Sequence, residues 1–239
     1  MANSYFQFKQ FLVNQDKAAM KVGTDGVLLG SWVSVDNCEE ILDVGTGTGL
    51  LALMLAQRNQ NAKVSAIDIE PGAVQQADEN FKLSPWESRL SVDNITLQAY
   101  AKSSTKQFDL IICNPPFFKS SLKSSNDNRN LARHNDALPF NQLISCAHKL
   151  SCPNGRLAVI IPADLELEFL EQINPYNYNL IRKLNVKPTP KKPIARVLLE
   201  FCKGEGKPLQ ERTIIVEDKG RHAYSDDFKN LMKEFYLNF

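Results

Sequence analysis

The sequence lacks the features that mark membrane-spanning and secreted proteins. No apolar run in its 239 residues approaches the roughly 18 residues that cross a bilayer as a helix. Residues 1–5, Met-Ala-Asn-Ser-Tyr, do not have the basic and then apolar layout of a signal peptide. We therefore expect a cytoplasmic protein that is not anchored in a membrane.

Cysteine and histidine are too few and too scattered for a disulfide framework or a zinc site. The 5 cysteines are odd in number and include no Cys-x-x-Cys pair, and the 3 histidines are not spaced as metal ligands. We expect reduced thiols and no bound metal. The chain also lacks a charge excess, because 28 basic residues face 27 acidic ones. Such a balance does not demand nucleic-acid binding, although a local basic patch remains possible.

Apolar runs alternate with helical patterns along the chain. An apolar content of 43% over this length is enough to bury the core of one domain. We expect strands at 40–44, 63–68, 89–92, 108–113, 156–161, 178–186, 195–202 and 214–216. We expect helices at 50–56, 72–83, 140–150, 165–173 and 226–236, a mobile loop at 119–130 and an irregular connection at 187–193. The alternation predicts an α/β fold with a largely parallel sheet.

A glycine-rich loop follows the first of these strands, with glycine at positions 45, 47 and 49. Without Cβ atoms, Gly45, Gly47 and Gly49 allow a tight turn and a close approach to a ligand, and the next helix offers free N–H groups to a carboxylate. The nicotinamide fingerprint needs its third glycine at position 50, where Leu50 stands, which disfavours a dehydrogenase. The pattern favours S-adenosylmethionine, with its ammonium facing Asp43. A simple strand-to-helix turn is the alternative.

Asp68 ends the second strand and is placed to accept hydrogen bonds from ribose hydroxyls, as an acidic residue does in dinucleotide-binding folds. The next residue, Ile69, offers an apolar surface for an adenine ring. The alternatives are a solvated aspartate and ordinary packing.

A second motif, Asn114-Pro115-Pro116-Phe117, follows the strand at 108–113. Because parallel strands end at one edge of a sheet, this corner should open beside the glycine loop. The two prolines remove competing backbone donors and hold the chain extended. Phe117 gives a flat apolar surface on which a base could stack. In isolation the run would be read as a strand-terminating turn.

The motif suits transfer of a methyl group to a planar amino group. The lone pair of such a nitrogen is delocalised into the ring, so the group needs two hydrogen-bond acceptors. The Asn114 side-chain oxygen and the Pro115 carbonyl can each accept one N–H and aim the lone pair at the methyl group. No general base is obligatory, because the nitrogen becomes acidic once it is methylated.

The chain resembles the class I S-adenosylmethionine-dependent methyltransferases of the N6-adenine type. It is more narrowly similar to the bacterial enzymes that methylate adenine 37 of tRNA1(Val). This resemblance rests on the two motifs above and on the segments 8–11, 20–30, 51–58, 84–86 and 235–237, which together span nearly the whole chain.

The resemblance implies a Rossmann-like fold with a seven-stranded, mostly parallel sheet, an antiparallel last strand and helices on both faces. It implies one methyltransferase domain over 1–239, with 1–37 as a cofactor-covering extension and 204–239 as a C-terminal strand and helix. Lys21 and Thr24 lie in the segment that crosses the cofactor in the family; an N-terminal turn and the start of a helix is the alternative for this segment. The implied reaction is methylation of the N6 amino group of the adenosine directly 3′ of the anticodon, with no obligate protein partner.

Basic residues form two clusters that could contact tRNA phosphates. The first follows the active-site corner and contains Lys119, Lys123 and Arg133. The second contains Lys191 and Lys192 and extends to Lys187 and Arg196. Solvated basic loops are the alternative for both clusters.

Several other activities fit the same motifs. Asn-Pro-Pro-Phe also occurs in guanine-N2 methyltransferases of ribosomal RNA, and DNA amino groups are chemically similar targets. A protein-glutamine methyltransferase or a non-catalytic RNA-binding module is less compatible with the whole sequence. Thr96 stands where relatives usually have an aspartate for the cofactor's adenine, with Asp93 and Asn94 nearby; we assign no residue to that contact.

Overall fold

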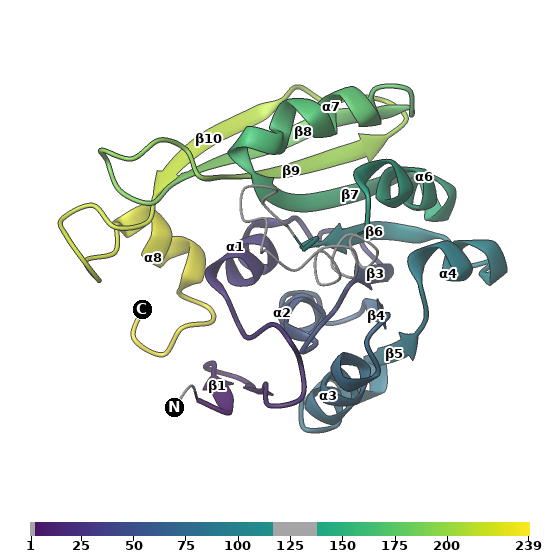
Figure 1. The fold of residues 1–239 in the computed structure, drawn as a ribbon, viewed down its shortest axis with the longest axis horizontal. Helices are drawn as coiled ribbons and strands as arrows, with labels where there is room; N and C mark the ends of the chain where they lie inside the picture. The colour runs from purple at the N-terminus through teal and green to yellow at the C-terminus, as the bar shows by residue number, and fades with distance from the viewer. Residues whose placement is uncertain (1–2, 117–137) are drawn as a thin grey trace, which may run out of the picture.

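The computed structural model describes residues 3–116 and 138–239 (Figure 1). The strands are β1 (Tyr5–Gln7), β2 (Leu12–Asn14), β3 (Glu40–Val44), β4 (Lys63–Asp68), β5 (Leu90–Asn94), β6 (Phe108–Cys113), β7 (Ser151–Pro162), β8 (Tyr178–Lys187), β9 (Arg196–Lys203) and β10 (Gln210–Ile215). The helices are α1 (Thr24–Trp32), α2 (Leu50–Arg58), α3 (Pro71–Lys82), α4 (Leu97–Ser103), α6 (Phe140–Leu150), α7 (Glu166–Ile173) and α8 (Asp226–Met232). Within these ranges, no helix has the length and apolar character needed to cross a bilayer.

The main sheet has eight strands in the order β10-β8-β9-β7-β6-β3-β4-β5. Only β9 runs against its neighbours, β7 and β8. The expected class, a mostly parallel sheet with an antiparallel strand that comes last among seven, is confirmed. The described part of the sheet contains one strand more than expected, because β10 extends it by pairing in parallel with β8. This pairing satisfies the backbone groups on the outer edge of β8, which would otherwise form an open edge.

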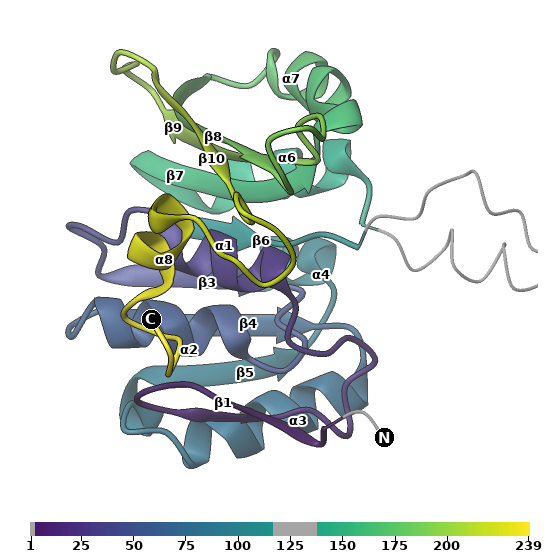
Figure 2. The same ribbon diagram turned by 90° about the vertical axis from the view of Figure 1, so that its left-hand side faces the viewer.

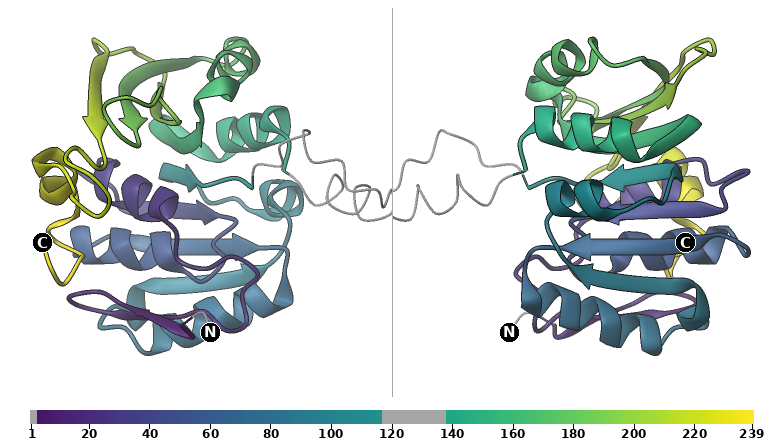
Figure 3. Two further views of the ribbon diagram at one scale, coloured as in Figure 1. Left: turned by 60° about the vertical axis from the view of Figure 1, so that its left-hand side comes forward. Right: turned by 90° about the vertical axis from the view of Figure 1, so that its right-hand side faces the viewer.

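Helices cover both faces of the sheet. One apolar core lies under α1, α2, α3 and α8, and the other under α4, α6 and α7. Figure 2 shows the first face, and the right-hand view of Figure 3 shows the opposite one. Central strands such as β3 are buried on both sides, which is why they read in the sequence as continuous apolar runs.

Two N-terminal elements and one internal helix do not stand out in the sequence. β1 and β2 form an antiparallel hairpin of three residues per strand, too short to show a period. α4 has seven residues, and its signal is the cap: the Thr96 hydroxyl accepts a hydrogen bond from the Ala99 N–H at 3.2 Å.

The first and last segments of the described chain pack against each other (Figure 2). The Lys9 N–H donates to the Phe235 carbonyl at 2.9 Å, and the rings of Phe6 and Tyr236 lie 5.9 Å apart. The division into an extension at 1–37 and an elaboration at 204–239 stays a prediction.

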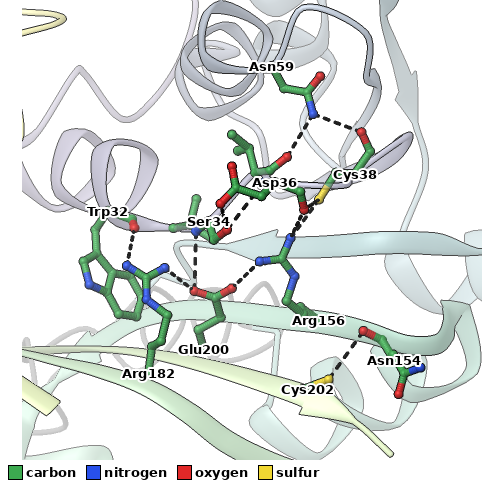
Figure 4. A network of polar contacts seen from close by, with 12 residues as sticks. Trp32, Ser34, Asp36, Cys38, Asn59, Asn154, Arg156, Arg182, Glu200 and Cys202 are labelled. Atoms are coloured by element: carbon green, nitrogen blue, oxygen red, sulfur yellow. Dashed lines mark hydrogen bonds and ion pairs between the residues drawn. The ribbon is translucent and has the colours of Figure 1, made fainter. Parts of the chain in front are cut away.

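A buried ionic network fixes the loop between α1 and β3 (Figure 4). The Glu200 side chain is fully buried and pairs with Arg156 at 2.8 Å and with Arg182 at 2.7 Å. Arg182 also donates to the Trp32 carbonyl at 3.0 Å, and its guanidinium lies 4.5 Å from the centre of the Trp32 ring. In the loop, the Ser34 N–H donates a hydrogen bond to the Glu200 carboxylate at 3.4 Å. The network therefore connects the end of α1 to three strands of the sheet.

Candidate active site

The glycine loop and the Asn-Pro-Pro corner leave neighbouring strands at one edge of the sheet. β3 pairs with β6 in parallel, and in this register Val44 lies opposite Cys113. The next residues, Gly45 and Asn114, therefore start at the same level. This carboxyl edge of the sheet is where open α/β sheets bind ligands.

The first turn of α1 closes a further side of the site. A Cβ built on Gly26 would lie 3.0 Å from the Leu50 side chain and 4.0 Å from the Asn114 Nδ2. Gly26 is itself buried. The absence of a side chain at this position allows α1 to pack closely against both motifs.

All three loop glycines have positive φ angles: 70° at Gly45, 57° at Gly47 and 82° at Gly49. Such angles are rare for residues with side chains. A Cβ on Gly45 or Gly47 would meet no atom within 4 Å, whereas one on Gly49 would lie 2.6 Å from the Phe81 ring. The first two positions therefore need glycine for their backbone angles, and Gly49 also needs it for space.

Asp43 is fully buried at the base of this loop. Its Oδ2 accepts hydrogen bonds from the Thr46 hydroxyl at 2.6 Å and from the Ala52 N–H at 3.2 Å. Its Oδ1 is buried without a hydrogen-bond partner among the described residues. Burial raises the pKa of the carboxyl to about 7, and the nearby Asp68 adds to the rise. An incoming cation would offset this cost, although the role of Asp43 toward an ammonium stays a prediction.

Asp68 connects the end of β4 to the glycine loop. Its Oδ2 accepts from the Gly47 N–H at 2.8 Å and its Oδ1 from the Glu70 N–H at 3.0 Å. Each carboxylate oxygen has a second lone pair that could accept from a hydroxyl. The neighbouring Ile69 is 44% exposed, which leaves an apolar surface beside the carboxylate. The ribose and adenine contacts stay predictions.

At the second motif, Asn114 is half-buried, Pro115 is buried and Pro116 is exposed. The thiol of the preceding residue, Cys113, is fully buried, and burial raises its pKa well above the usual value. A thiol whose pKa is raised in this way is a poor nucleophile. The predictions for Phe117, Lys119, Lys123 and Arg133 fall outside the described residues.

Lys21 and Thr24 are exposed on the segment that leads into α1. The Lys21 Nζ lies 3.4 Å from the Asn3 carbonyl, and Thr24 is the first residue of the helix. The next residue, Asp25, pairs with Arg196 at 2.7 Å. Cofactor contacts by Lys21 and Thr24 stay predictions.

The second basic cluster contains both exposed and engaged side chains. Lys191 and Lys192 are exposed. Arg196, which we grouped with the phosphate-binding candidates, is half-buried and engaged by Asp25, so it anchors α1 to β9. Lys187 donates to the Pro190 carbonyl at 2.9 Å.

A loop that sequence reasoning did not connect with this cluster lies beside it. The Val216 N–H donates to the Lys187 carbonyl at 2.8 Å, and the Glu217 N–H to the Pro188 carbonyl at 3.0 Å. This loop adds the exposed Lys219 and Arg221, together with the acidic Glu217 and Asp218. Only the three-dimensional pairing of β8 with β10 brings the two loops together.

Thr96 is occupied as the cap of α4, and Asn94 donates to the Asp68 carbonyl at 3.0 Å. Within the ranges that the structure describes, no three His, Cys, Asp or Glu side chains gather as a metal site would require.

The sheet, with its glycine loop and Asn-Pro-Pro corner on neighbouring strands, defines a class I methyltransferase. The chain belongs to the methyltransferase small domain family, whose model matches residues 18–173. A solved structure from Agrobacterium tumefaciens, described as a predicted O-methyltransferase, has the same fold with a TM-score of 0.70 at 21% identity. The match covers 88% of this chain and 96% of that one.

Curated relatives share far more sequence. A protein of Trichodesmium erythraeum named tRNA1(Val) (adenine(37)-N6)-methyltransferase is 45% identical over 100% of both chains. Proteins of the same name from Flavobacterium johnsoniae and Parabacteroides distasonis are 45% and 44% identical. These matches cover 97% and 99% of this chain and 99% of each relative.

Proposed function

We propose that this methyltransferase transfers a methyl group from S-adenosylmethionine to the N6 amino group of adenosine 37 in tRNA1(Val). The observation that carries the proposal is the register of β3 and β6, in which Val44 lies opposite Cys113. A cofactor at the glycine loop and an amino group at Asn114 would then be neighbours. The names of the full-length relatives support the choice of substrate.

The residues present fit S-adenosylmethionine. Asp43 offers a buried, unsatisfied carboxylate oxygen to an ammonium. α2 begins directly after the loop, and although its Ala52 N–H is bonded to Asp43, the N–H groups of Leu50 and Leu51 could serve a carboxylate. Asp68 would accept from the ribose and Ile69 would lie against the adenine. When bound, the cofactor supplies an electrophilic methyl group on a sulfonium. Lys21 and Thr24 would close over it from the N-terminal side.

The protein's contribution to the transfer is to orient the amino group. The Asn114 Oδ1 and the Pro115 carbonyl would each accept one N–H of the adenine, so that the nitrogen lone pair points at the methyl group. The methylated nitrogen then loses a proton to solvent. Phe117 would support the base by stacking.

An adenine in an anticodon loop must leave its stack to reach Asn114, which costs less in a loop than in a duplex. The phosphates on either side of this adenosine would be neutralised by positively charged side chains. Lys191 and Lys192 would supply this charge from one side of the site, and Lys119, Lys123 and Arg133 would contribute from the segment after the corner.

The test is methyl transfer from labelled S-adenosylmethionine to unmodified total tRNA and to ribosomal RNA, followed by nucleoside analysis. We expect N6-methyladenosine in a valine tRNA, and no label in a transcript of that tRNA with guanosine at position 37. N2-methylguanosine in ribosomal RNA would overturn the base and the substrate. Bound cofactor with no RNA product would overturn the proposed RNA methylation.

A further inference from the structure

Three residues of α3 form a face that receives the N-terminal segment. Gly72, Gln76 and Asn80 are spaced four residues apart, so they follow one another along one side of the helix. Gln76 and Asn80 are both fully buried. Buried amides on a helix need partners, and the hydrogen bonds that these two side chains make all go to residues outside α3.

The partners lie in residues 14–22, which we call the strap. The Asn80 Oδ1 accepts from the Asn14 N–H and its Nδ2 donates to the Asn14 carbonyl, both at 2.9 Å. The Gln76 Oε1 accepts from the Lys17 N–H at 2.9 Å. A Cβ on Gly72 would lie 2.9 Å from the Lys17 carbonyl oxygen. The strap therefore crosses α3 in close contact from Asn80 to Gly72.

The far part of the strap is fixed by one of its own residues. Gln15 is buried, and its Oε1 accepts from the Val22 N–H at 2.9 Å. The strap then continues through Gly23 into α1, whose first turn lies against Asn114. Its position therefore affects the approach to the active-site corner.

Asn80 also touches the glycine loop. Its Nδ2 donates a second hydrogen bond, 2.8 Å long, to the carbonyl of Thr48, which stands between Gly47 and Gly49. One buried amide group thus connects the strap with the loop.

The second amide is only partly satisfied. The Gln76 Nε2 is buried with no hydrogen-bond partner among the described residues. An unsatisfied buried donor destabilises a fold.

We propose that the face of Gly72, Gln76 and Asn80 couples the strap to the glycine loop, and that Asn80 is a positioning residue for cofactor binding. A docked strap holds the Thr48 carbonyl and thereby the loop, and a ligand that orders the loop favours the docked strap in return. This inference rests on the proposed binding of S-adenosylmethionine at the loop.

The first test moves the strap without altering the loop. Gly72→Ala places a methyl group against the Lys17 carbonyl. A Cβ at this position would not contact residues 45–49. We expect the dissociation constant for S-adenosylmethionine, measured by calorimetry, to rise about fivefold or more. A wild-type affinity in this variant would contradict the coupling.

The second test alters Asn80, which bonds both the strap and the glycine loop. Asn80→Asp keeps the acceptor for the Asn14 N–H but loses both donors, so we expect a larger loss of affinity, about tenfold or more. Asn185→Asp is the matched control, because Asn185 is also buried but bonds Glu211 on β10, away from the loop. The control should lose stability and keep its affinity for S-adenosylmethionine.

Hydrogen exchange separates coupling from a purely structural role. Adding S-adenosylmethionine should slow exchange of the Asn14 and Lys17 amides in the wild type, and less so in Asn80→Asp. Wild-type affinity in both variants, with no effect of cofactor on these amides, would overturn the inference alone. A wild-type protein that does not bind S-adenosylmethionine would overturn the proposed function and the inference with it. If the cofactor binds and shows this coupling but no RNA is methylated, only the proposed substrate is overturned.

Discussion

Asp43 is completely buried, and one of its carboxylate oxygens has no hydrogen-bond partner among the described residues. The protonation state of this side chain therefore depends on its surroundings. Burial raises its pKa to about 7 in the folded chain. The unfolded chain has the ordinary value near 4, so between these two values the folded state binds the proton more tightly. The stabilisation from this group is full below about pH 4 and is lost as the pH rises through about 7.

We therefore expect Asp43→Asn, which is neutral throughout, to show a smaller loss of stability between roughly pH 5 and 8 than the wild type does. Urea unfolding of the ligand-free protein at several pH values measures this difference. Because an ammonium favours the charged carboxylate, cofactor affinity should increase through about pH 7 in the wild type only. Parallel curves for the two proteins would show that Asp43 does not titrate as described.

Asn114 is expected to act on the substrate and not on the cofactor. Asn114→Ala should lower the methyl-transfer rate about 100-fold or more, while the dissociation constant for S-adenosylmethionine changes little. Single-turnover kinetics and calorimetry measure the two quantities. Asn61→Ala, at an exposed position in the loop between α2 and β4, is the control. Wild-type turnover in Asn114→Ala would disprove the mechanism.

At the residue scale, the sequence predicts what local chemistry determines. The three glycines and Asn114 are recognisable because each follows an apolar run, and the structure places both motifs on neighbouring strands. Asn80 could not be predicted, because its partners lie 66 and 32 residues away in the sequence. The pairing of Arg196 with Asp25 was missed for the same reason.

At the scale of elements, Glu200 holds the end of α1 against β7, β8 and β9 (Figure 4). Glu200→Gln would leave the charges of Arg156 and Arg182 without their buried counter-charge. We expect a loss of about 3–5 kcal/mol in the free energy of unfolding, the usual cost when one member of a buried ion pair is removed. Urea unfolding measures it.

Glu168→Gln is the control for that substitution, because Glu168 is an exposed residue of α7. Its free energy of unfolding should stay within about 0.5 kcal/mol of the wild type. Equal stability of the two variants would show that the network does not stabilise the fold.

The elements that the sequence predicts best are those with a clear apolar pattern, either a helical period or a continuous apolar run. α6 has the expected bounds, and β3, β4 and β6 match the expected strands. The observed bounds of β5 and β10 differ from the expected ones. Most residues of these two strands are exposed, which weakens the apolar pattern in the sequence. The hairpin of β1 and β2 depends on contacts with other parts of the chain, including α3, and local sequence does not report such contacts.

At the scale of the whole molecule, RNA affinity should depend on charge at the carboxyl edge of the sheet. The double variant Lys191→Glu, Lys192→Glu should bind tRNA more weakly and with a smaller dependence on salt, because fewer counterions are released. Fluorescence titration of tRNA at several salt concentrations measures both effects.

The control is the double variant Lys63→Glu, Lys102→Glu, which changes the net charge of the protein by the same amount. Lys63 begins β4 and Lys102 lies in the last turn of α4, so both are exposed at the opposite edge. This variant should keep the wild-type salt dependence. Equal losses in the two double variants would mean that net charge, and not the position of Lys191 and Lys192, governs binding.

The contact between residues 5–9 and 235–239 also has a consequence for the order of events during synthesis. The Lys9 side chain donates to the carbonyls of Lys233 and Phe239, at 2.6 and 2.8 Å. A nascent chain on the ribosome makes residues 5–9 early, yet these contacts cannot form until residues 233–239 have emerged. The central strands can pair earlier, so residues 5–9 are among the last parts of the described chain to dock.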